Sequence, residues 1–393
     1  MVDGLAADGH DVARSGPDAP ERRSRGGTRV FITDDRLRAT ANNLTLVRLV
    51  LASAVIWSHS YWRILGVANQ DELSPWLGTT ISAYAVDGFF FLSGFLVYRS
   101  LSVRGSVVDF AVARLARLWP GLAVAVALTI LGGYFLSALP PGVYLNGNTL
   151  SFAIKNLSLL AAHYNLTGLQ CGSEPCVVNG SLWTIPWEVR CYALLALLAL
   201  VGFASPHWMA RLILPLTAAG ALGLHVPGMA TMIEMIGSKG LLYNVQLIDR
   251  LWTMFALGIA AYMWRDRLRL SWTVLLLLGV LNLAAQHWHI HIHIQSLFVG
   301  YAVLCCGFLS ARHRAISGSW PDYSYGMYIY AFPVMMLLAA AFTFSHHGWL
   351  ALANAAATLP LAALSWHLVE RPVLDRVRRR NRAKSAVIVQ SKS

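Results

Sequence analysis

Two ionisable side chains, Arg48 and His59, lie eleven positions apart in the first long apolar stretch of the chain, 44–62. At about 100° per residue, eleven residues return a helix to nearly the same face and span about 16 Å along its axis. Ionisable groups at membrane depth are costly and usually mark a transport pathway or a reaction centre. The spacing therefore predicts two functional groups on one face of a membrane-spanning helix.

The two residue types suggest complementary chemistry. A guanidinium binds an anionic group, phosphate above all, through paired hydrogen bonds. An imidazole exchanges a proton near neutral pH. Together they suit a long anionic donor whose charged end binds Arg48 and whose reactive end reaches His59. The alternative is a snorkelling arginine and an interfacial histidine without a catalytic role, and the pair alone does not decide between the two.

The composition indicates what must position these groups. Of the 393 residues 56% are hydrophobic and 13% are charged, and the mean hydropathy is +0.53. A soluble protein carries about 25% charged residues. The net charge of +12 is spread over segments between apolar stretches and the C-terminal end, so we expect no nucleic-acid partner. The composition predicts an all-α, polytopic membrane protein in the lipid bilayer.

Ten apolar stretches have the length of a membrane span. They are 44–62, 79–98, 120–139, 183–203, 208–225, 247–264, 271–287, 291–310, 323–344 and 348–368. A further apolar segment, 150–166, contains polar residues, and we expect a re-entrant or surface piece there.

The arginines predict an orientation for these spans. With both termini cytoplasmic, most of them fall on the cytoplasmic side, and the opposite loops contain little beyond Arg63, Lys155, Lys239 and Arg250. This arrangement satisfies the positive-inside rule. We therefore expect about ten transmembrane helices with both termini cytoplasmic.

The composition also divides the chain into three parts. Residues 1–40 are polar and have no signal-peptide core, so we expect a disordered cytoplasmic extension. Residues 41–373 form the transmembrane domain, and 374–393 form a basic cytoplasmic tail.

Five further segments carry polar or small residues in apolar surroundings. FFLSGFL at 90–96 allows close helix packing, and RLARLWP at 114–120 contributes Arg114 and Arg117. SLWTIPWEVRCY at 181–192 places Glu188 in an apolar helix. YSYGMYIY at 323–330 and VERP at 369–372 complete the set.

Together these segments resemble the integral-membrane acyltransferase-3 family, whose members O-acylate polysaccharides, lipopolysaccharide and some small molecules. The resemblance covers roughly residues 41–373. Its most specific features are the Arg48–His59 spacing and FFLSGFL. The chain departs from many members at Ala331, where they have a histidine. That departure places more of the expected proton transfer on His59.

The resemblance implies acyl transfer, most simply of acetyl, from cytosolic acyl-CoA to a hydroxyl of an exported or membrane-linked glycan or glycolipid. Acyl-CoA is then a substrate, and no permanently bound cofactor is expected. Arg48, Arg114 and Arg117 would bind the donor, and His59 would be the general base that deprotonates the hydroxyl. An acyl-histidine intermediate remains open. The family occupies the cell (inner) membrane as a multi-pass protein.

The roles of two carboxylates in the apolar stretches, Glu188 and Asp87, stay open at this point. Glu188 either orients or charge-balances Arg48, Arg190 or His59, or it forms a structural ion pair. Asp87 has a weaker claim to a direct role. Ser93 and Tyr330 are more simply packing and hydrogen-bonding residues than nucleophiles.

Cysteines and histidines offer no metal site. Cys171 and Cys176 bound the run CGSEPC in the longest outside loop, where an oxidising exterior favours a disulfide. The histidines at 287, 289, 291 and 293 fall in a short turn without companion ligands, so we expect an interfacial turn.

A transporter of a glycolipid or a small anion is the rival hypothesis, because buried ionisable groups also form transport pathways. Transporters often contain paired halves. The chain shows no internal repeat, which favours the acyltransferase.

Overall fold

The computed structural model describes residues 31–104, 106–169, 176–287, 291–312 and 314–390, and every regular element in these ranges is helical. The all-α prediction is confirmed. The ten predicted stretches correspond to α1 Leu44–Leu65, α3 Ile81–Arg104, α4 Val107–Leu136, α7 Thr184–Leu200, α9 Leu214–Gly223, α11 Lys239–Met263, α12 Trp272–Ala284, α13 His291–Leu304, α14 Ser324–Ala341 and α15 His347–Ser365. The other α-helices are α2 Ser74–Leu77, α5 Pro141–Tyr144, α6 Asn148–Leu157, α8 Pro206–Trp208, α10 Met229–Ile236 and α16 Arg371–Gln390.

Seven helical segments of the described residues are long and apolar enough to cross a membrane. They are Leu44–Leu65, Ile81–Val103, Val107–Leu136, Gly180–Leu200, His291–Leu309, Ser324–Ala341 and His347–Asn381. The predicted stretches 208–225, 247–264 and 271–287 correspond to α9, α11 and α12, which lie outside this set. Helices α9 and α12 are short, and α11 carries Lys239, Asp249 and Arg250.

Helix α4 begins thirteen residues before the predicted stretch 120–139, at Val107. The Ser106 side chain accepts a hydrogen bond from the Asp109 backbone N–H, which satisfies one of the free donors at a helix N-terminus. Arg114 and Arg117 therefore lie on a helix, where the sequence suggested only a basic segment leading into it.

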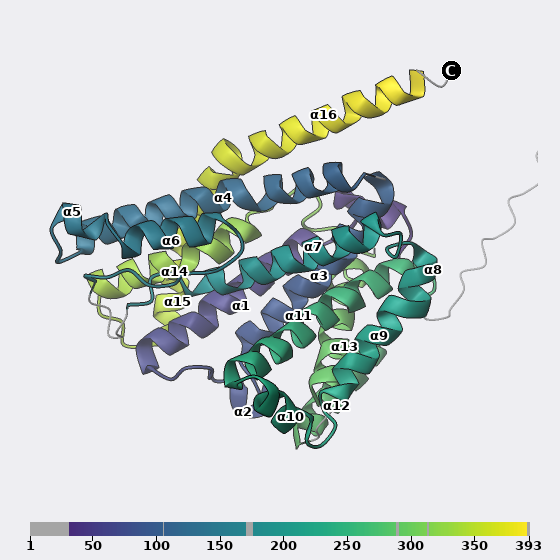
Figure 1. The fold of residues 1–393 in the computed structure, drawn as a ribbon, viewed down its shortest axis with the longest axis horizontal. Coiled ribbons are helices and arrows are strands. Elements are labelled where there is room, and N and C mark those ends of the chain that lie inside the picture. The colour runs from purple at the N-terminus through teal and green to yellow at the C-terminus, as the bar shows by residue number, and fades with distance from the viewer. Residues whose placement is uncertain (1–30, 105, 170–175, 288–290, 313, 391–393) are drawn as a thin grey trace, which may run out of the picture.

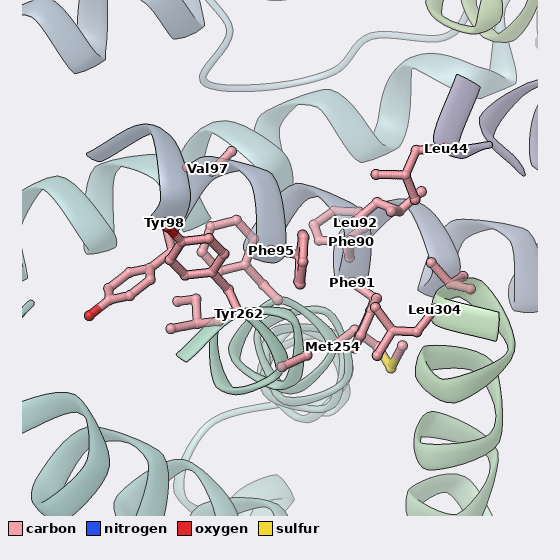
Figure 2. Close-up of a cluster of buried hydrophobic side chains, with 14 of the residues drawn as sticks. Leu44, Phe90, Phe91, Leu92, Phe95, Val97, Tyr98, Met254, Tyr262 and Leu304 are labelled. Atoms are coloured by element: carbon pink, nitrogen blue, oxygen red, sulfur yellow. The ribbon is translucent and has the colours of Figure 1, made fainter. Parts of the chain in front are cut away.

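Helix α3 is the centre of the bundle and packs on α1, α11 and α13. Figure 2 shows the aromatic and aliphatic side chains of this contact, among them Phe91, Phe95 and Met254. A Cβ added to Gly94 would lie 1.9 Å from the Phe255 carbonyl oxygen. Glycine is therefore needed in FFLSGFL because the two backbones touch.

Helix α1 packs against α3, α14 and α15, so the helix that carries Arg48 and His59 has neighbours from both halves of the chain. The predicted surface piece 150–166 contains α6, which packs on α4. Beyond the bundle, α16 runs past α4 and its C-terminal end stands clear of the other helices (Figure 1). The predicted basic tail 374–393 is helical as far as Gln390. Residues 1–30 of the predicted extension lie outside the described residues.

Candidate active site

A cavity of about 570 Å³ contains four of the five predicted site residues. Arg48 comes from α1, Arg114 and Arg117 from α4, and Glu188 from α7. The remaining polar lining residues are Thr45, Ser93, Arg99, Thr184, Tyr192, Asp322, Ser324, Tyr325, Tyr328 and Arg378. The arginines outnumber the carboxylates, so the cavity favours an anion.

Asp322, which the sequence analysis did not select, joins two of the cavity arginines. Its Oδ2 accepts hydrogen bonds from Arg48 Nη1 and, at 2.7 Å, from Arg117 Nη2. Its Oδ1 accepts from the Ser324 hydroxyl at 2.6 Å. Burial raises the pKa of Asp322, but Arg48 and Arg117 outweigh burial and lower it to about 2. Asp322 is therefore an ionised link between α1 and α4.

Arg117 is held from three further sides. Its Nη1 donates to Glu370 Oε2 at 3.3 Å, and its guanidinium lies 5.5 Å from the ring centres of both Tyr325 and Trp366. Trp366 and Glu370 bound a π-helical segment, Trp366–Glu370, between α15 and α16. Such segments are rare and often occur at functional sites. The motif VERP thus contributes Glu370, which pairs with the cavity residue Arg117 without lining the cavity itself.

Arg48 keeps one edge of its guanidinium free. Only Nη1 donates a hydrogen bond among the described residues, and Nε is buried without a partner. The Nε–Nη2 edge is one of the two edges that bind an oxyanion with a pair of parallel hydrogen bonds. Arg48 can therefore hold an anion in the cavity while Asp322 holds its other side.

Arg114 is a second cation with spare donors. Its Nη2 lies 3.5 Å from the Ser100 hydroxyl, and its Nε is buried without a partner. No carboxylate pairs with it within the described part of the chain. Its charge is available to a ligand.

Glu188 is bound by hydroxyl groups. Its Oε1 accepts a hydrogen bond from Tyr192 and another, at 3.2 Å, from Ser93. In the described structure no ion pair joins it to Arg48 or Arg190, two of the partners considered from the sequence. Arg190 instead lies 4.3 Å from the centre of the Trp187 ring and donates to a backbone carbonyl. The carboxylate is oriented towards the cavity by its own helix and by α3.

His59 lies on α1 as predicted but does not line the cavity. Its half-buried ring packs edge-on against Phe332, with the ring centres 5.1 Å apart. No hydrogen bond reaches it from the described residues. Between it and Arg48, Ala52 and Ile56 of α1 pack in a cluster that Phe89 also contacts. One helix thus carries both predicted groups, and an apolar layer separates them.

Asp87 belongs to a separate buried cluster. Its Oδ1 accepts from Arg250 Nε at 2.8 Å and its Oδ2 from Gln295 at 3.0 Å. The prediction that Arg250 lies in an outside loop is wrong, because α11 begins at Lys239 and carries Arg250 into the bundle. These contacts give Asp87 a structural role between α3, α11 and α13.

Cys176 is disulfide-bonded, while Cys171 lies outside the described residues. Cys191, Cys305 and Cys306 are free thiols. Within the described residues no group of three or more histidine, cysteine, aspartate or glutamate side chains is arranged to hold a metal. Of the histidine run, His289 lies outside these residues, and the His293 ring lies 4.8 Å from that of His225.

Comparison with known proteins decides the family. Residues 42–367 match the acyltransferase domain family Acyl_transf_3. The chain belongs to this family. It is 28% identical to nodulation protein 10 of Rhizobium leguminosarum bv. viciae over 357 residues, 85% of this chain and 93% of that protein. It is also 28% identical to the O-acetyl transferase of Shigella phage Sf6 over 353 residues, 86% of this chain and 97% of that one. No solved structure matches the chain.

The resemblance seen in the motifs is thereby confirmed, and the protein is a multi-pass membrane acyltransferase. The residue that sequence reasoning missed in this acyltransferase is Asp322. It directly precedes YSYGMYIY at 323–330, and an acidic residue beside that motif, in a chain with so few charges, was the available signal.

Proposed function

We propose that this acyltransferase moves an acyl group, acetyl in the first instance, from cytosolic acyl-CoA to a hydroxyl of an exported or membrane-linked glycan. The observation that carries the proposal is the arginine-lined cavity with the free Nε–Nη2 edge of Arg48. Phosphate groups are the anions that such an edge recognises. An acyl-CoA offers phosphates at one end and a reactive thioester at the other.

The proposed topology places the cavity towards the cytosol. Ten spans with both termini cytoplasmic put Arg48, Arg114 and Arg117 near the inner face of the cell membrane, in keeping with the positive-inside rule. Arg99 and Arg378 also line the cavity. A cytosolic anion that enters the cavity then meets several positive charges.

In the proposed reaction the donor phosphates bind Arg48, Arg114 and Arg117. The acylated arm passes the apolar layer beside Phe89 towards His59, about 16 Å farther along α1. The His59 imidazole takes the proton of the acceptor hydroxyl, and the oxygen attacks the thioester carbonyl. The carbon–sulfur bond breaks, the imidazolium returns its proton, and free CoA and the ester leave. Glu188, which accepts hydrogen bonds from Tyr192 and Ser93, adds a negative charge to the cavity that offsets part of the positive charge of its arginines.

Membrane vesicles test this proposal directly. Inverted vesicles expose the cytoplasmic face, so radiolabelled acetyl-CoA added outside them reaches the cavity. We expect alkali-labile label in the glycan or glycolipid fraction with the wild-type protein and a loss of at least about tenfold with Arg48→Met. Arg267→Met, an exposed arginine outside the cavity, is the matched control. If wild type, Arg48→Met and Arg267→Met label the glycan equally, the proposal is contradicted. It is also contradicted if intact wild-type protein transfers no label.

A further inference from the structure

A second hollow lies beside the cavity and is lined by arginines without carboxylates. Its volume is about 510 Å³. Its lining residues are Arg36, Thr40, Ala41, Ala311, Arg312, Arg314, Ala315, Gly318 and Ser319. Three guanidinium groups and two hydroxyls make it a site for an anion with several oxygen atoms.

No carboxylate in the described part of the chain forms an ion pair with the arginines of this hollow. Arg36 Nη1 donates to the Phe308 carbonyl oxygen at 3.2 Å, which leaves its positive charge uncompensated. The exposed side chains of Arg312 and Arg314 make no hydrogen bond or ion pair with any described residue. By contrast, Asp322 and Glu370 offset part of the charge in the cavity. The hollow therefore offers three positive charges to an anion.

Two short segments separate the hollow from the cavity. Ala39 and Trp320 line the cavity, whereas Thr40 and Gly318 line the hollow. The segments touch through their backbones, because a Cβ added to Gly318 would lie 2.7 Å from the Thr40 carbonyl oxygen. Two arginine-lined spaces thus lie on either side of one thin wall.

We infer that the hollow binds the 3′-phosphate at the nucleotide end of acyl-CoA, while the cavity holds the pyrophosphate and the acylated arm. This inference rests on the proposed function. Acyl-CoA carries its phosphates in two groups separated by a ribose, which matches two cationic spaces separated by a narrow wall. The hydroxyls of Thr40 and Ser319 can donate to phosphate oxygens beside the three arginines.

Binding of CoA and of 3′-dephospho-CoA to the full-length protein in nanodiscs tests the inference. The wild type should bind CoA about tenfold or more tightly than dephospho-CoA. Arg312→Ala/Arg314→Ala should weaken CoA binding until the two ligands bind equally, with dephospho-CoA unchanged. Arg267→Ala/Arg269→Ala removes the same charge from exposed positions outside both spaces and should keep the wild-type preference.

The other outcomes overturn the inference in distinguishable ways. If the first double variant keeps the preference for CoA, the hollow does not bind the 3′-phosphate, and the proposed function stands. Equal weakening of both ligands shows a general charge effect instead. If that variant changes only the binding of anionic phospholipid in the nanodisc, the hollow binds lipid phosphate. If wild type binds neither CoA nor dephospho-CoA, the proposed function itself fails.

Discussion

Replacing Asp322 by asparagine removes the charge that links α1 to α4 while keeping nearly the same shape. The Asp322 pKa lies at about 2, below the ordinary value of 3.8. A difference of this size corresponds to about 2 kcal/mol of folding free energy at neutral pH. The variant also leaves Arg48 and one side of Arg117 without their shared carboxylate. We therefore expect Asp322→Asn to lower the free energy of unfolding by about 2 kcal/mol or more.

The same interaction predicts a pH dependence. Because the Asp322 pKa is lower in the folded protein than in the unfolded chain, its contribution is complete above about pH 4 and is lost as the pH falls towards 2. The wild type should therefore lose this part of its stability on acidification, and Asp322→Asn should lack that loss.

Thermal unfolding in nanodiscs at pH 7 and at pH 3 measures both effects. Asp266→Asn is the control, since that side chain is 64% exposed and lies 3.9 Å from its partner Arg265; exposed pairs contribute little. If Asp322→Asn unfolds at the wild-type midpoint at pH 7, or if it retains the wild-type loss of stability at pH 3, Asp322 does not stabilise the fold as an ionised link between α1 and α4.

Single substitutions at Arg48, Gly94 and Asp87 test other contacts of the bundle. Arg48→Lys keeps the positive charge but loses the Nε–Nη2 edge. The KM for acyl-CoA, measured from initial rates, should therefore rise about tenfold. An unchanged KM would show that this edge does not bind the donor. Gly94→Ala forces a methyl group against a backbone carbonyl of α11. It should lower the free energy of unfolding, measured by thermal unfolding, by about 1–3 kcal/mol. The control Gly220→Ala has open space around the added methyl group and should not lower it. Asp87→Ala leaves Arg250 unpaired and should lower the free energy of unfolding by about 3–5 kcal/mol. Adding Arg250→Met should recover most of that free energy. A double variant as unstable as Asp87→Ala alone would contradict the pairing.

Hydropathy was enough to locate the helices, because lipid-facing and buried positions are both apolar in a membrane bundle. Each of the ten predicted stretches overlaps a helix. Hydropathy was less informative at helix ends, where charged residues continue a helix. Arg114 and Arg117 on α4 both lie on helical turns that the apolar window 120–139 left out.

The site was predictable where its residues belong to motifs and not where they meet across the fold. Arg48, Arg117 and Glu188 each lie in a recognisable segment, and the structure brings them to one cavity. Asp322 is 274 positions from Arg48 in the chain, so only the tertiary fold reveals their pairing. The π-helical segment that carries Glu370 likewise has no signal in periodicity.

We propose that His59 and Arg48 serve one acyl-transfer reaction from opposite ends of α1. The most direct measurement is the amount of ester-linked acetyl on the surface or secreted glycans of cells that carry wild type or His59→Ala. We predict that the esters disappear in His59→Ala while the protein reaches the membrane in wild-type amounts. Undiminished acetylation, together with failure of the unmodified glycan to appear outside the cell, would show that His59 has no role in acyl transfer and would favour a transporter.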